Sequence, residues 1–107
     1  MLYLVDTVSV DPSRSDDYLR LVETSGVAIM RDAGATLVSC WSTSRKLGDQ
    51  VDILLVWSVG DFATWNATRK NLVLDPRWHC YAKEAALLRS GGTRRFYEAA
   101  PFSPDAR

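Results

Sequence analysis

The fold is decided by residues 36–59, "TLVSCWSTSRKLGDQVDILLVWSV", which contain two runs rich in β-branched, aliphatic and aromatic side chains. Such runs favour β-strands. Between them stand Leu47, Gly48 and Asp49, a length and chemistry typical of a hairpin loop. We therefore expect two neighbouring strands over 36–46 and 50–59.

The preceding chain predicts a strand followed by a helix. Residues 2–10, "LYLVDTVSV", have little helical periodicity and end at "DP", so we expect a strand there. From Ser13 or Ser15 to about Ala33 apolar residues recur at helical spacing, with polar residues on the other side. Gly34 supplies a natural stop for this helix.

The following chain predicts two shorter helices and a last strand. Asp61 is a suitable N-cap for a helix over 62–72, and Asp75 for a second helix with Pro76 at its first position. Two glycines at 91–92 are expected to end that second helix before the strand "TRRFYEA" (93–99). The order is that of an α+β, ferredoxin-like βαββαβ fold with a broken second helix, in a single domain over 1–107 whose tail spans 99–107.

Composition narrows the range of partners. The 107 residues include 13 Lys plus Arg and 13 Asp plus Glu, so no net charge attracts nucleic acid or an anionic membrane. No apolar run approaches the length of about 20 residues that spans a bilayer, and the N-terminus does not read as a signal peptide. We expect a cytoplasmic protein that binds neither nucleic acid nor membrane, with its two cysteines as free thiols.

The predicted sheet is apolar on both faces. Residues 50–59 place Ile53 and Trp57 on one face and Leu54 and Val56 on the other. Helices between the strands can cover only one face, so the other needs a second cover, and a second copy of the chain is the simplest. Two such sheets face to face predict a homodimeric α+β barrel with room for a small-molecule ligand.

Several segments resemble the NIPSNAP-like family. They are "MLYLVDTVSVDPSRSDDYLRL" at the start, "VWSVGDFATW" at the end of the third strand, "LVLDPRWHCYAKEAALL" with its Asp-Pro-x-Trp helix start, and "APFSP" near the end. Each motif is short, but their joint order covers nearly the whole chain. The resemblance implies a dimeric α+β barrel, a fold shared with small monooxygenases, lactone isomerases, polyketide cyclases and haem-degrading enzymes. It implies no single reaction, and Asp6 and His79 are not carried over from its motifs.

Asp6 is the first catalytic candidate. It stands in the middle of an apolar strand, where an unpaired carboxylate is costly to bury. One interpretation is a general acid or base with a raised pKa inside the barrel. The other is an ion pair with Arg94 or Arg95 of the last strand, or a place at the wet rim of the barrel.

His79, the only histidine, is the second catalytic candidate. It lies about 100° round the helix from Trp78, on the flank of the apolar stripe. That place suits a proton carrier at the mouth of a pocket and suits equally a half-solvated side chain. His79 and Cys80 diverge on the helix, so we expect no metal site, and no motif indicates a cofactor.

Further residues are candidates for substrate binding. Tyr3, Trp41, Trp57 and Tyr97 occupy strand positions from which they can line the barrel or fill its core. Arg94 and Arg95 point to opposite faces of a regular strand, so one of them faces inward or across the dimer seam, where it can hold a carboxylate or enolate.

Three functions fit these features. The first is a barrel that binds a small, largely apolar cyclic or aromatic metabolite and catalyses a cofactor-independent isomerisation, cyclisation, elimination or oxygenation. The second is a non-catalytic binding or accessory protein with the same pocket. The third is a dimeric interaction module whose barrel is filled by its own side chains.

Overall fold

The strands of the computed structural model follow the predicted order, and the structure describes residues 1–44 and 50–104. Four strands pair antiparallel in the order β2-β3-β1-β4. Their bounds are β1 (Leu2–Val10), β2 (Thr36–Ser42), β3 (Val51–Val59) and β4 (Arg89–Tyr97). This is the ferredoxin-like α+β fold expected from the sequence. The predicted hairpin loop at 47–49 lies outside the described residues.

The first predicted helix is built from three consecutive segments. After a short 3-10 turn, η1 (Pro12–Arg14), the chain forms α1 (Ser15–Leu21), a π-helical turn η2 (Val22–Gly26) and α2 (Val27–Ala33). A π-helical turn inside an α-helix is uncommon and is frequent at functional sites. Gly34 ends the helix with a φ of 124°, which few other residues adopt, so the predicted stop is confirmed.

The two shorter helices begin at the predicted caps. They are α3 (Phe62–Val73) and α4 (Pro76–Leu88). The Asp61 carboxylate accepts the backbone N–H of Thr64 at 2.7 Å, and the Asp75 carboxylate accepts that of Arg77 at 2.9 Å. These bonds satisfy backbone donors that the first helical turn leaves unpaired.

The end of α4 differs from the prediction. The helix stops at Leu88 and β4 begins at Arg89 without a loop, so Gly91 and Gly92 lie inside the strand. The pairing of β1 with β4 shifts register beside these glycines, as glycines in strands often indicate. A Cβ on Gly92 would lie 3.3 Å from the carbonyl oxygen of Thr7, closer than most side chains tolerate. Gly92 therefore serves close strand pairing, whereas a Cβ on Gly91 would meet no atom within 4 Å.

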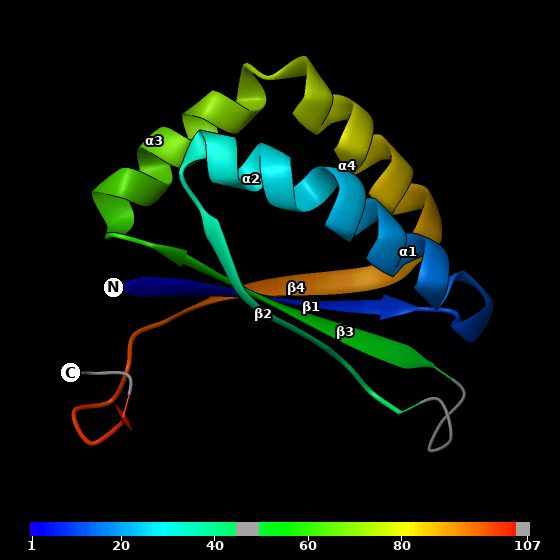
Figure 1. Cartoon of the computed structure of the whole chain (residues 1–107), viewed down its shortest axis with the longest axis horizontal. Helices are drawn as coiled ribbons and strands as arrows, with labels where there is room; N and C mark the ends of the chain where they lie inside the picture. Colours follow the sequence, from blue (N-terminus) through cyan, green and yellow to red (C-terminus); the bar gives the residue numbers. More distant parts are fainter. Residues whose placement is uncertain (45–49, 105–107) are drawn as a thin grey trace.

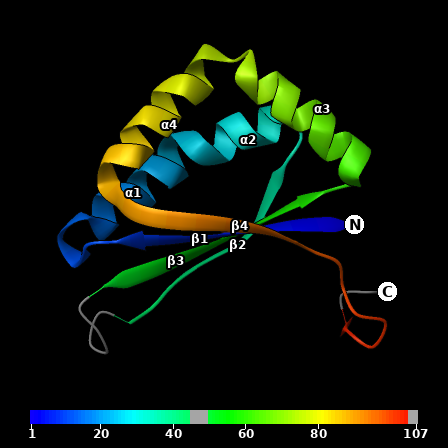
Figure 2. The same cartoon turned by 180° about the vertical axis from the view of Figure 1, so that it is seen from behind.

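The helices all lie on one side of the sheet, and the other side carries no helix (Figures 1 and 2). The core fills the space between the two layers. Its largest fully buried apolar members are Trp57, Leu4, Met30, Ile53, Val10 and Val51. No helix in the described ranges, 1–44 and 50–104, is long and apolar enough to cross a membrane.

Candidate functional site

Asp6 lies on the helix-covered face of the sheet. Side chains of β1 alternate between the two faces, and the neighbours of Asp6 on its own face, Leu4 and Val8, are buried under the helices. A carboxylate at this position is enclosed by apolar side chains and needs partners from the adjacent strands.

Both adjacent strands supply those partners. Arg94 of β4 is paired directly with Asp6 across the strands, and its Nε and Nη2 donate to Oδ1 at 2.6 Å and to Oδ2 at 2.8 Å. From β3, the indole Nε1 of Trp57 donates to Oδ2 at 3.2 Å. The result is a bidentate ion pair with a third donor, the geometry in which an arginine binds a carboxylate most strongly. The ion pair considered from the sequence is therefore present, and Arg94 forms it.

The guanidinium of Arg94 is held on a second side by an aromatic ring. Its Cζ lies 5.1 Å from the ring centroid of Trp65 on α3, within cation–π distance. Burial lowers the pKa of Arg94, but the hydrogen bonds and the charge of Asp6 outweigh burial and raise it overall. Arg94 is thus a fixed cation between the sheet and α3.

Two buried tyrosines lie near the ion pair. Tyr18 of α1 and Tyr81 of α4 are both buried, and each phenol contributes to the pKa shift of the other. Burial is the main cause that raises the pKa of each phenol, so both stay protonated well above neutral pH. Protonated phenols can donate a hydrogen bond to an oxygen of a ligand.

These groups line a common cavity of about 340 Å³ between the sheet and α4, which we call the Asp6 cavity. Its wall combines the ion pair and the tyrosines with apolar side chains and with one further cation, Arg89. The complete lining is Asp6, Val8, Tyr18, Trp78, Tyr81, Ala82, Ala85, Arg89, Gly92, Thr93 and Arg94. It lies within a single chain, between its sheet and its helices.

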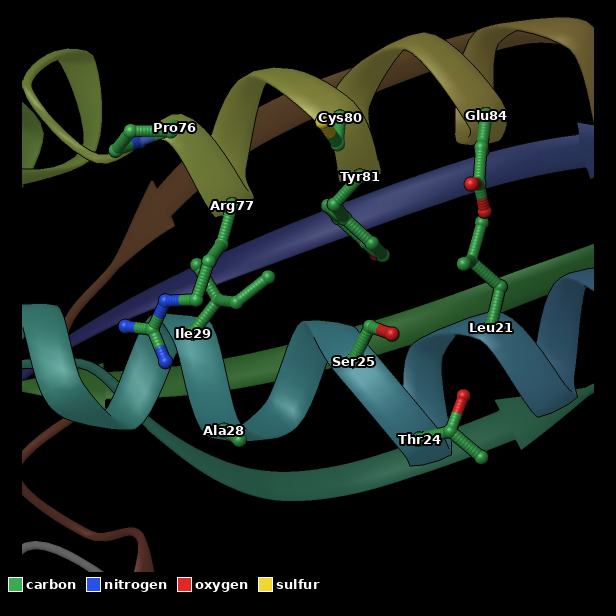
Figure 3. Close-up of a pocket in the computed structure, with 10 residues that line it drawn as sticks. All are labelled: Leu21, Thr24, Ser25, Ala28, Ile29, Pro76, Arg77, Cys80, Tyr81 and Glu84. Carbon is green, nitrogen blue, oxygen red and sulfur yellow. The ribbon is translucent and has the colours of Figure 1, made fainter.

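A second hollow, of about 470 Å³, lies between α4 and the segment α1-η2-α2. Figure 3 shows Tyr81 pointing from α4 toward the facing helices, with Ser25 and Leu21 opposite. Tyr81 borders both hollows. It packs so closely on η2 that a Cβ on Gly26 would lie 2.8 Å from its hydroxyl oxygen. The π-helical turn therefore presents a glycine where Tyr81 needs the space.

Four of the predicted binding residues lie on the opposite, open face of the sheet. Tyr3 and Tyr97 are paired across β1 and β4, Arg95 is opposite Val5, and Trp41 of β2 is 60% exposed. Tyr3, Trp41 and Tyr97 border a hollow of about 450 Å³. The predicted binding residues thus separate into two groups, because Trp57 and Arg94 are with Asp6 under the helices.

His79 does not share the cavity of Asp6. Its side chain is exposed, and its Nε2 lies 2.7 Å from the carbonyl oxygen of Val73, the last residue of α3. It is absent from the lining of the Asp6 cavity. The structure therefore places the histidine at the junction of α3 and α4, as a partner for a backbone carbonyl that the helix end leaves unpaired.

Sequence reasoning missed Tyr18, Tyr81, Trp65 and Arg89 as members of the site. Tyr18 and Tyr81 fall on the apolar stripes of their helices, so the pattern assigned them to the core. One signal was available, because a buried tyrosine usually finds a partner for its hydroxyl. Arg89 was missed because the predicted helix extended past it, so Arg89 was not assigned to the last strand.

Comparison with known proteins identifies the family of the chain. The family profile described as NIPSNAP matches residues 3–104. The chain belongs to the NIPSNAP family. No curated protein matches this NIPSNAP chain.

Solved structures share the fold of this NIPSNAP domain. A NIPSNAP domain protein from Burkholderia xenovorans is 23% identical with a TM-score of 0.82, and the match covers 98% of this chain and 100% of that one. Protein Atu4242 from Agrobacterium tumefaciens is 24% identical with a TM-score of 0.84, over 97% of this chain and 98% of that one. A cofactor-independent oxygenase from Streptomyces nogalater is 15% identical with a TM-score of 0.61, over 96% of each chain.

Both cysteines of the NIPSNAP domain, Cys40 and Cys80, are free and exposed. Within the part of the chain that the structure describes, no three His, Cys, Asp or Glu side chains gather as ligands of a metal ion would. The ionisable groups of the Asp6 cavity are a carboxylate, two guanidinium groups and two phenols. These groups suit recognition of a polar group and transfer of a proton.

Proposed function

We propose that this NIPSNAP-family protein binds a small, largely apolar cyclic or aromatic molecule in the Asp6 cavity and transfers a proton to or from one of its carbon atoms. The observation that carries the proposal is that the Asp6–Arg94 ion pair opens into a cavity with aromatic and apolar walls. Ligand pockets typically combine such walls with a few convergent polar groups. The cavity volume of about 340 Å³ suits a molecule of two or three fused rings.

Asp6 is the proposed base. An ionised carboxylate has about four lone-pair sites, and three donors occupy sites on Asp6. The remaining site can accept a proton from a carbon beside a carbonyl group of the ligand. The electron pair of the broken C–H bond then moves onto the carbonyl oxygen and forms an enolate. In this proposal Arg94 and the phenol of Tyr81 stabilise that negative charge.

Several reactions share this first step. Return of the proton to another carbon isomerises the ligand, and attack of the enolate on a second carbonyl group closes a ring. Loss of a leaving group completes an elimination, while addition of dioxygen begins an oxygenation. The oxygenase from Streptomyces nogalater, described as cofactor-independent, supports the idea that this fold can host such chemistry.

The proposal includes a homodimer formed through the open face of the sheet. Partly buried side chains such as Val5, Leu54 and Val56 form an apolar surface there, and Trp41 and Val38 are more than half exposed. Figure 1 shows that no helix covers this face. Apolar surface of this kind usually marks an interface, and a second copy placed face to face completes a barrel.

Deuterium exchange tests the proton transfer without knowledge of the natural substrate. We would incubate the protein with 2-tetralone, a bicyclic ketone with acidic C–H bonds, in D₂O and follow exchange by NMR. We expect the protein to accelerate the exchange relative to buffer. In Asp6→Asn the exchange rate should fall at least tenfold, while the affinity for 2-tetralone, measured by tryptophan fluorescence, stays unchanged. Asp17→Asn, an exposed carboxylate on α1, is the matched control.

The outcomes separate the functions considered. Binding without accelerated exchange would indicate a non-catalytic binding protein. Exchange that persists in Asp6→Asn would remove Asp6 from the mechanism. Absence of binding of the ketone and of related fused-ring compounds would overturn the proposal and favour a dimeric interaction module.

A further inference from the structure

The charges that line the Asp6 cavity do not balance. Asp6 and Arg94 neutralise each other in their bidentate pair. Arg89 is the remaining charged side chain of the lining, and among the described residues no carboxylate forms an ion pair with it. The cavity therefore carries an excess of one positive charge.

The position of Arg89 directs that charge toward the cavity. Arg89 joins α4 to β4 without a loop, and its guanidinium lies beside Gly92, where a Cβ would be 3.5 Å from Nη1. Since Gly92 has no side chain, nothing from that residue stands between the guanidinium and the cavity wall. The charge of Arg89 also acts on Tyr18 and Tyr81, whose pKa values are raised chiefly by burial and are lowered in part by this charge.

Arg89 lies at the mouth of the cavity. Its side chain is exposed, whereas Tyr81 and Ala85 in the wall are buried. A ligand with its rings against the tyrosines and Trp78 would therefore have its outer end at Arg89. An apolar ring with an acidic group at one edge matches this arrangement, because the guanidinium fork binds carboxylates and similar oxyanions.

We infer that the ligand of the Asp6 cavity is an anion, a cyclic or aromatic acid whose acidic group pairs with Arg89 at the mouth while its rings lie inside. This inference rests on the proposed function, since it names the class of molecule that the same cavity takes. It adds a specificity-determining residue that neither the sequence pattern nor the family resemblance indicated.

Two fluorescent dyes with one scaffold test the inference. 1-Anilinonaphthalene-8-sulfonate carries a sulfonate, and N-phenyl-1-naphthylamine is the same molecule without it. We expect the anionic dye to bind about tenfold more tightly than the neutral dye, as a charge-assisted hydrogen bond allows. Arg89→Gln should abolish this preference by weakening the anionic dye alone, and added salt should reduce the preference in the parent protein.

Two variants control for binding elsewhere. Arg95→Gln removes a positive charge from the same strand on the open face and should leave the preference unchanged. Ala82→Phe places a large side chain in the Asp6 cavity and should weaken the binding of both dyes.

Equal affinity of the parent protein for the two dyes, or a preference that Arg89→Gln retains, would overturn the inference while leaving the cavity as a binding site. If neither dye binds, or Ala82→Phe weakens neither, the proposed function fails as well.

Discussion

The guanidinium of Arg94 binds both carboxylate oxygens of Asp6 from the directly paired position on the neighbouring strand. Because Asp6 is on β1, a central strand, its carboxylate also receives the indole of Trp57 from the other neighbour, β3. One carboxylate thus connects three strands at the floor of the candidate site. Asp6 and Arg94 depend on each other, since removing either one leaves an unpaired charge in a partly buried place.

Loss of Arg94 should therefore destabilise the fold. We expect Arg94→Met to lower the free energy of unfolding by about 2 kcal/mol, because the Asp6 side chain is only 13% exposed and loses its counter-charge. Urea denaturation measures this loss. The double variant Asp6→Leu with Arg94→Met should lose less than the single variant, and Arg95→Met on the open face should lose little. Additive losses in the double variant would contradict a coupled pair.

A side chain at Gly26 should destabilise the fold. We expect Gly26→Ala to cost about 1–3 kcal/mol in the free energy of unfolding, because the new Cβ would lie 2.8 Å from the Tyr81 hydroxyl. The same variant should shift Tyr81 and change dye binding in the Asp6 cavity. Gly91→Ala is the matched control, since its Cβ would have no atom within 4 Å. Equal effects of the two substitutions would show that the contact with Tyr81 is unimportant.

Alkaline pH should weaken the fold through the buried phenols. Burial raises the pKa of Tyr18 and Tyr81 in the folded chain, whereas unfolded tyrosines ionise near pH 10. Above about pH 10 the unfolded chain then binds fewer protons than the folded chain, so the free energy of unfolding falls as pH rises. We expect the fall to be shallower in Tyr81→Phe when unfolding is measured from pH 9 to 12. If the free energy of unfolding falls equally steeply with pH in both proteins, Tyr81 is not the cause of the alkaline destabilisation.

A single substitution on the open face should separate the proposed dimer. We expect Trp41→Lys to raise the dimer dissociation constant about 30-fold or more, because a large exposed aromatic ring is a typical interface anchor. Light scattering after gel filtration reports the mass. Leu74→Lys, which replaces a residue that is 81% exposed at the end of α3, should remain dimeric. A parent protein of monomer mass would remove the dimer from the proposal.

His79 should act on stability and leave the proton transfer unchanged. His79→Ala removes the partner of the Val73 carbonyl, 2.7 Å away, and should cost about 1 kcal/mol in the free energy of unfolding. We expect deuterium exchange into 2-tetralone to proceed as in the parent protein. A loss of exchange comparable to that of Asp6→Asn would return His79 to the mechanism.

Local chemistry made much of the fold predictable. The caps at Asp61 and Asp75, the stop at Gly34 and the β-rich run of β3 act within a few residues, so the sequence pattern indicates them directly. The end of α4 was predicted too late because the two glycines lie in the strand paired with β1, where Gly92 allows a close approach between segments distant in the sequence.

The sequence by itself determined that Asp6 is a carboxylate in an apolar strand, that Arg94 and Arg95 face opposite sides, and that both faces of the sheet are apolar. Only the tertiary structure decided which face the helices cover and which arginine pairs with Asp6. It also decided that Tyr18, Tyr81 and Arg89 meet in one cavity. Periodicity fixes the relative direction of side chains along one element, whereas the choice of face depends on packing between elements far apart in the chain.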